Sequence, residues 1–128
     1  MAKQVITVPT SLPGIPYSPG MKAGDYIFVS GQVGHVDSQG KKREGVEAQT
    51  RQVLDNMRRV LEAAGTSMDD VVKTTVFLVR AEDFPKMNEV YKTYFTRDLP
   101  ARSTVIVAAL ARPEMVVEIE CIAYRPQR

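Results

Sequence analysis

The chain has 128 residues, of which 44% are hydrophobic, and this fits a single domain over residues 1–128 with its own core. Its 17 lysines and arginines against 15 aspartates and glutamates give a net charge of +2, and the two signs are interspersed, which argues against nucleic acid as a partner. No apolar run approaches a membrane span, and the first residues lack the apolar stretch of a secretory signal. We therefore expect a cytoplasmic protein with no membrane partner.

The chain contains one cysteine, Cys121, and one histidine, His35. A single cysteine excludes an internal disulfide, and the two residues together do not supply the ligands from which zinc sites are usually assembled. His35 lies in the sequence GHVDSQG at residues 34–40, which is typical of a turn. We expect neither a metal nor a catalytic histidine.

Residues 9–24 contain seven prolines and glycines, too many for a helix or a central strand, and this predicts a loop. Tyr17 is its only large aromatic residue, and it either packs on the surface or faces a site. The β-branched and aromatic residues at 26–33 predict a strand, interrupted by Ser30 and Gly31. This interruption indicates a β-bulge, or the close approach of another backbone or a ligand.

Apolar residues recur at three- and four-residue spacing over residues 46–64, which predicts an amphipathic helix. Gly65 is its stop signal. Ser67, followed by Asp69 and Asp70, favours one short helical turn before the next element.

The second half of the chain contains three predicted strands and one helix. Residues 71–79 have strand composition, and helical spacing returns over residues 83–95, with Asn88 outside the apolar stripe. Two further strands are expected at residues 103–109 and 115–124. This order predicts an α+β fold in which a mixed sheet is covered on one face by two helices.

The last predicted strand carries two acidic residues on one face. Alternation places Glu118 and Glu120 together and Cys121 on the opposite face, where we expect it to be buried and inert. If the acidic face is solvated, the pair needs no further explanation. If either carboxyl lines a cleft, desolvation and like charge raise its pKa and suit it to proton transfer.

Arg102 stands where a loop stiffened by Pro100 enters a strand at the edge of the sheet. A guanidinium held there can bind a carboxylate through two parallel hydrogen bonds. A surface arginine, or a salt bridge to Glu118 or Glu120, fits this position equally well.

Five segments taken together resemble the RidA/YjgF/UK114 family, in order and spacing, over nearly the whole chain. They are FVSGQ at 28–32, QTRQVLDN at 49–56, VKTTVFL at 72–78, PARS at 100–103 and VEIE at 117–120. The resemblance implies a chorismate-mutase-like fold that assembles as a homotrimer around a central barrel, with clefts between subunits.

The resemblance also implies an activity: cofactor-free hydrolysis of 2-enamine and 2-imine acids, such as 2-aminoacrylate and 2-iminobutyrate, to 2-oxo acids and ammonia. Arg102 matches the arginine that binds the substrate carboxylate, and Glu118 matches the glutamate that positions water. Further positions match residues that line the cleft or contact the substrate: Tyr17, Ser30, Gly31, Asn88 and Thr104.

The chain departs from the family pattern at three positions. Thr104 stands where many relatives carry cysteine, so a thiol role is absent there while a hydroxyl donor is retained. Ile15 and Pro19 replace a frequent glycine and glutamine beside Tyr17, which can reshape the cleft.

Two alternatives stay open. One is a pathway-specific deaminase, acting on 2-aminomuconate or on the aminoacrylate of pyrimidine breakdown. Another is a protein that binds small carboxylates without turnover, which would not need an acid at Glu118. Some relatives are described as ribonucleases, but the charge pattern and the single histidine argue against that class.

Overall fold

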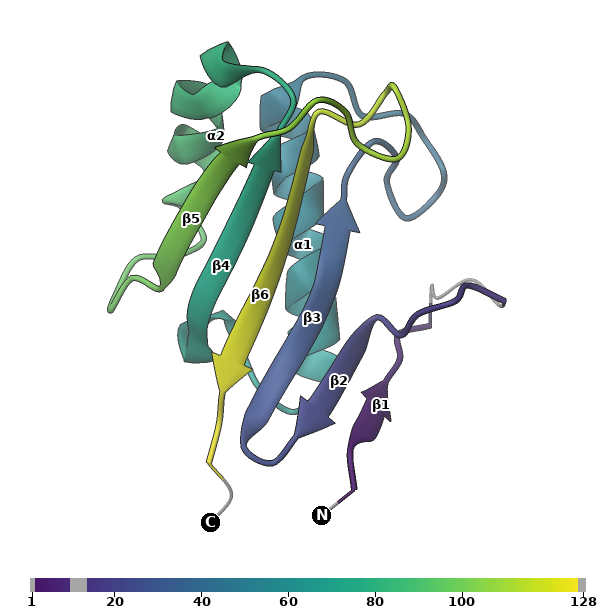
Figure 1. Ribbon diagram of the computed structural model, residues 1–128, viewed down its shortest axis with the longest axis vertical. Helices are drawn as coiled ribbons and strands as arrows, with labels where there is room; N and C mark the ends of the chain where they lie inside the picture. The colour runs from purple at the N-terminus through teal and green to yellow at the C-terminus, as the bar shows by residue number, and fades with distance from the viewer. Residues whose placement is uncertain (1, 10–13, 127–128) are drawn as a thin grey trace.

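A mixed six-stranded sheet with two α-helices on one face makes up the computed structural model, which describes residues 2–9 and 14–126 (Figure 1). The strand order is β1-β2-β3-β6-β4-β5, and only the pair β4 and β5 is parallel. The strands are β1 (Gln4–Ile6), β2 (Gly20–Ala23), β3 (Tyr26–Val33), β4 (Val71–Leu78), β5 (Ala101–Ile106) and β6 (Val117–Tyr124). The predicted α+β class, with both helices on one face of a mixed sheet, is confirmed.

The long helix α1 (Val46–Ala63) forms because one stripe of its surface is apolar, and the core residues of this stripe are fully buried. It ends at Ala63, and Gly65, two residues beyond, has a φ of 78° that is unfavourable for other residues, while Thr66 N donates to Leu61 O in a Schellman-type closure. The predicted short turn follows as η1 (Met68–Asp70), which opens with a capping box.

The second helix, α2 (Phe84–Tyr91), is shorter than the predicted range 83–95 and is preceded by η2 (Ala81–Asp83). Beyond Tyr91 the helix gives way to 3-10-type hydrogen bonds, in which the backbone N–H groups of Thr93 and Tyr94 donate to the residue three positions earlier. The hydroxyl of Thr93 also donates to Val90 O, at 2.6 Å. The apolar spacing nevertheless predicted the burial of Phe95, which is buried although it lies beyond the end of the helix.

The predicted loop over residues 9–24 is wrong for residues 20–23, because β2 lies there between β1 and β3. Gly20 was counted among the breakers, yet it makes the strand possible: a Cβ there would come within 2.9 Å of Val60 on α1. Pro13, another of the predicted breakers, lies outside the described residues.

The bounds of β5 and β6 differ from those predicted. β5 begins two residues before the predicted range 103–109 and ends at Ile106, while β6 begins at Val117 rather than at residue 115. The earlier start of β5 matters for the site, because Arg102 is then a strand residue with a fixed facing rather than part of the preceding loop.

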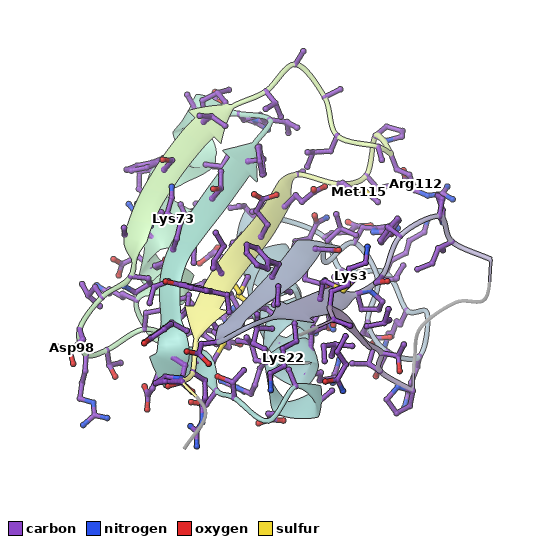
Figure 2. The ribbon with its side chains drawn as sticks, turned by 60° about the horizontal axis from the view of Figure 1, so that its bottom comes forward. Lys3, Lys22, Lys73, Asp98, Arg112 and Met115 are labelled. Carbon is purple, nitrogen blue, oxygen red and sulfur yellow. The ribbon has the colours of Figure 1, made fainter. Side chains whose placement is uncertain are left out.

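The core lies between the sheet and the helices, so the other face of the sheet is uncovered (Figure 1). Tyr26, Phe28 and Tyr124 stand on this uncovered face with 42–46% of their surface exposed, and the Tyr26 ring lies 5.2 Å from that of Tyr124. Lys73 of β4 stands there too and donates to Ser103 Oγ at 3.0 Å (Figure 2). Among the described residues, no helix is both long enough and apolar enough to cross a membrane.

Candidate active site

Glu118 projects from β6 onto the uncovered face of the sheet, as the alternation of the sequence predicted. It is half-buried, and it lies directly against Gly31 of β3. A Cβ at Gly31 would overlap the Glu118 carboxylate, so the missing side chain at residue 31 makes room for that carboxylate.

Ser30 and Gly31 form a bulge in β3. Val29 pairs with Cys121 and Gln32 with Ile119, so two residues of β3 oppose one residue of β6. The predicted bulge is therefore present, and the group that lies against Gly31 is the Glu118 side chain. Ser30 is tied to the loop that carries Tyr17, because its backbone N–H donates to Pro19 O at 3.0 Å.

The environment of Glu118 favours its protonated form. Burial raises the pKa of this carboxyl, and the nearby negative charge of Glu120 adds to the effect. Such a carboxyl loses its proton less readily than an ordinary one, and its ionised form is a stronger base, so it accepts a proton more readily.

Cys121 faces the core, as predicted, and is 3% exposed. Burial, with the charge of Glu120 adding to it, raises the pKa of its thiol to about 12. A thiol that is both buried and protonated is a poor nucleophile, in line with the expectation that Cys121 is inert.

Arg102 lies on the opposite face of the sheet from Glu118. In the register of β4 and β5 it pairs with the fully buried Thr74, so it points toward α2, and its guanidinium carbon lies 4.8 Å from the Tyr91 ring centre and 5.7 Å from that of Phe84. The alternative of a salt bridge from Arg102 to Glu118 or Glu120 is therefore wrong.

The aromatic platform under Arg102 is itself held in place. The Tyr91 hydroxyl is hydrogen-bonded to Thr74 Oγ1 at 2.7 Å, and burial raises the pKa of Tyr91, so the ring stays neutral. A guanidinium stacked on a ring keeps the N–H groups along its edge available for a bidentate partner.

Asn88 and Thr104 lie on the same side of the sheet as Arg102. Thr104 pairs with the buried Val76 in the register of β4 and β5. Asn88 is half-buried on α2, and helical spacing places it one turn from both Phe84 and Tyr91. These residues form one set with Arg102.

The predicted site residues therefore divide into two sets in one chain. We call Arg102, Asn88 and Thr104 the guanidinium set, and Tyr17, Ser30, Gly31 and Glu118 the carboxylate set. Two cavities of about 380 Å³ each are lined by members of the carboxylate set: one by Tyr17 and Ser30, the other by Tyr17 and Gly31. The guanidinium set and Glu118 line neither of them.

Sequence reasoning missed the aromatic residues that hold Arg102. Phe84 and Tyr91 are seven residues apart with Asn88 between them, a helical spacing that could have signalled a shared face. His35 lies in the predicted turn and lines the second cavity, apart from Arg102 and Glu118. Within residues 2–9 and 14–126, no three His, Cys, Asp or Glu side chains gather to hold a metal ion.

Comparison with known proteins gives consistent matches over almost the whole chain. The family model described as Endoribonuclease L-PSP matches residues 9–125. A RutC family protein of Pyrococcus horikoshii is 44% identical over 98% of this chain and 99% of its own length. The 2-iminobutanoate/2-iminopropanoate deaminase of Mus musculus is 47% identical over 84% of this chain and 80% of its own. The crystal structure of Escherichia coli TdcF with bound serine superposes with a TM-score of 0.87 at 38% identity, covering 95% of this chain and 98% of that one.

Proposed function

Because the chain belongs to the Endoribonuclease L-PSP family, which is the RidA/YjgF family of the sequence analysis, we propose that it is a hydrolytic deaminase of 2-imino acids. The observation that carries this conclusion is its identity to relatives named 2-iminobutanoate/2-iminopropanoate deaminase, which extends over most of both chains. The products are a 2-oxo acid and ammonia.

The proposed active site is shared between two copies of the chain. The guanidinium set and the carboxylate set lie on opposite faces of one sheet, so one chain cannot apply both to the same small substrate. A neighbouring copy can bring its guanidinium set against the carboxylate set of the first. The exposed Tyr26, Phe28 and Tyr124 on the uncovered face support burial against other copies, in a homotrimer around a central barrel.

In this site Arg102 binds the substrate carboxylate. Its guanidinium is planar, and the rings of Tyr91 and Phe84 restrict its tilt, so two parallel hydrogen bonds to the carboxylate fix the direction in which the imine carbon lies. Asn88 and the hydroxyl of Thr104, beside it, supply further hydrogen bonds.

Glu118 handles the proton. Its carboxylate accepts a proton from a water molecule as the water oxygen bonds to the carbon of the protonated imine, and the C=N bond becomes a single bond in a neutral carbinolamine. The protonated Glu118 then returns this proton to the nitrogen. The C–N bond breaks with its electron pair on ammonia, the keto group forms as the hydroxyl proton passes to the Glu118 carboxylate, and ammonia takes up that proton and leaves as ammonium. The raised pKa of Glu118 suits these transfers.

The proposal is tested by generating 2-iminobutanoate with an amino-acid dehydratase and following release of 2-oxobutanoate. We expect Arg102→Ala to raise KM strongly and Glu118→Ala to lower kcat by roughly a hundredfold with substrate binding retained. Equal rates for the wild type and both variants would refute the deaminase.

A mixing experiment tests the shared site. When Arg102→Ala and Glu118→Ala chains are co-expressed in equal amounts, about a quarter of the interfaces in random oligomers combine an intact Arg102 with an intact Glu118. We therefore expect about a quarter of wild-type activity, at a substrate concentration where each variant alone shows only a small residual rate. Activity that stays at the level of the separate variants would exclude a site built from two chains.

A further inference from the structure

Among the residues that the structure describes, no strand lies along the outer edge of the C-terminal half of β3. β2 accompanies β3 only as far as Val29. Beyond that point other groups hold the β3 backbone: Gln32 Nε2 donates to Ser30 O at 2.9 Å, and Asn56 Nδ2 of α1 donates to Val33 O at 3.0 Å. A helix side chain thus takes the place of a neighbouring strand at Val33.

The orientation of the Asn56 amide is fixed from its other end. Gln52 Nε2 and Arg59 Nη1, which lie one helical turn before and after it, both donate to Asn56 Oδ1, at 2.8 and 3.1 Å. With the oxygen accepting two hydrogen bonds, the amide nitrogen is left to donate toward β3. Gly34, directly after the strand, packs on Gln52, where a Cβ would come within 3.0 Å of the Gln52 Cβ.

The residue that Asn56 holds is the partner of Glu118. In the pairing of β3 with β6, Val33 lies opposite Glu118, and Gly31 lies against its carboxylate. Within the described residues the Glu118 side chain makes no hydrogen bond or ion pair of its own. Its position is therefore set by packing against β3, and that part of β3 is held by Asn56.

We propose that Asn56 is a positioning residue for Glu118, acting through Val33 and the end of β3. Its catalytic consequence rests on the proposed deaminase function, whereas its effect on the Glu118 carboxyl does not. Loss of the Asn56 hydrogen bond lets the end of β3 move away from β6, which admits water to the carboxyl and loosens the geometry of proton transfer.

The test uses Asn56→Leu, which keeps the approximate size of the side chain and removes the donor to Val33 without adding charge. We expect kcat for 2-iminobutanoate to fall about tenfold, while the Kd for 2-oxobutanoate, whose carboxylate is bound by the Arg102 of a neighbouring copy, changes less than twofold. We also expect the pKa of the Glu118 carboxyl to fall toward its ordinary value as solvent enters. An NMR titration measures this pKa, and the Glu118→Gln variant assigns the signal.

Asp55→Leu is the matched control. Asp55 is the preceding residue of the same helix, and it accepts a hydrogen bond from Tyr94 Oη at 2.8 Å and pairs with Arg58, away from β3. We expect it to lower stability by a similar amount and to leave kcat and the Glu118 titration unchanged. Equal losses of kcat in both variants, or an unmoved Glu118 titration in Asn56→Leu, would reduce Asn56 to a structural role. A wild type without deaminase activity would refute the proposed function instead, and the titration would still decide the positioning role.

Discussion

At the residue scale, Glu118 and Glu120 lie two residues apart on one strand yet differ in surroundings. Glu118 is half-buried against the bulge, whereas Glu120 is exposed. The charge of Glu120 nevertheless reaches its neighbour and helps to raise the pKa of Glu118. The second acid thus tunes the first without needing to contact substrate.

The variant Glu120→Gln tests this tuning. Removing a negative charge makes ionisation of Glu118 easier, so the pKa of Glu118 falls. If the ionised form is the active one, kcat/KM rises with pH through this pKa, and the acidic limb of the profile moves to lower pH in the variant. The measurement is the pH profile of kcat/KM, with the exposed Glu62→Gln on α1 as the control that leaves the limb in place.

The sequence predicted residue facings well and residue neighbours poorly. Alternation along one strand was enough to place Glu118 and Cys121 on opposite faces, because a strand has a fixed period. The platform of Phe84 and Tyr91 under Arg102 could not be predicted in this way, since it depends on how a separate helix crosses β5. For the same reason the sequence did not show that Arg102 and Glu118 lie on opposite faces, because that placement also depends on how separate elements pack together.

At the element scale, Gln49 connects α1 to the loop before β6. It is 2% exposed, its Nε2 donates to Arg43 O and Glu114 O, and its Oε1 accepts from Val116 N at 3.0 Å. One side chain therefore satisfies three backbone groups from two separate segments. This connection fixes the start of the strand that carries Glu118.

Replacing Gln49 with leucine leaves those three backbone groups without their partner. We expect Gln49→Leu to lower the free energy of unfolding by about 3 kcal/mol, as unpaired buried polar groups do. Urea unfolding monitored by circular dichroism measures this loss. The exposed Arg51→Leu on the same helix should change stability by less than about 0.5 kcal/mol, and a similar loss in both variants would contradict the connecting role.

Elements with strong periodicity were predicted within a few residues. The largest error is the missed strand β2, where glycines and prolines were taken as evidence against a strand. α1 and β4 match their predicted ranges closely, because long apolar patterns dominate there. β2 was missed because Gly20 disfavours strands in isolation, whereas packing against Val60 requires a glycine at that position. Tertiary contacts decided what local propensity could not.

At the scale of the whole molecule, the uncovered face of the sheet is the surface on which the proposed assembly would depend. We expect Phe28→Glu to produce a folded monomer, because a charge is readily solvated at this exposed position but costly to bury between copies. Light scattering after size exclusion gives the mass, and a deaminase assay on the same fractions gives the activity, which should be lost with assembly. The exposed Ala63→Glu on α1 should retain both, and an active monomer of Phe28→Glu would contradict the shared site.

The assembly itself was implied by the resemblance and not by any pattern in the chain. Composition and periodicity predict which face of a strand is apolar, but they do not distinguish a face covered by a helix from one covered by another copy. The exposed aromatic residues on the sheet became visible only when the structure had placed both helices on the other side.

The placement of Arg102 and Glu118 on opposite faces has a consequence for dosage. If catalysis needs two copies, activity follows mass action: on dilution below the dissociation constant of the assembly, total activity falls more steeply than protein concentration, so the activity per milligram of protein falls as well. A cell that makes little of this chain would hold intact protein with almost no catalytic capacity. Deaminase activity would then rise more steeply than expression level, so the amount of protein in the cell would itself control whether the enzyme is active.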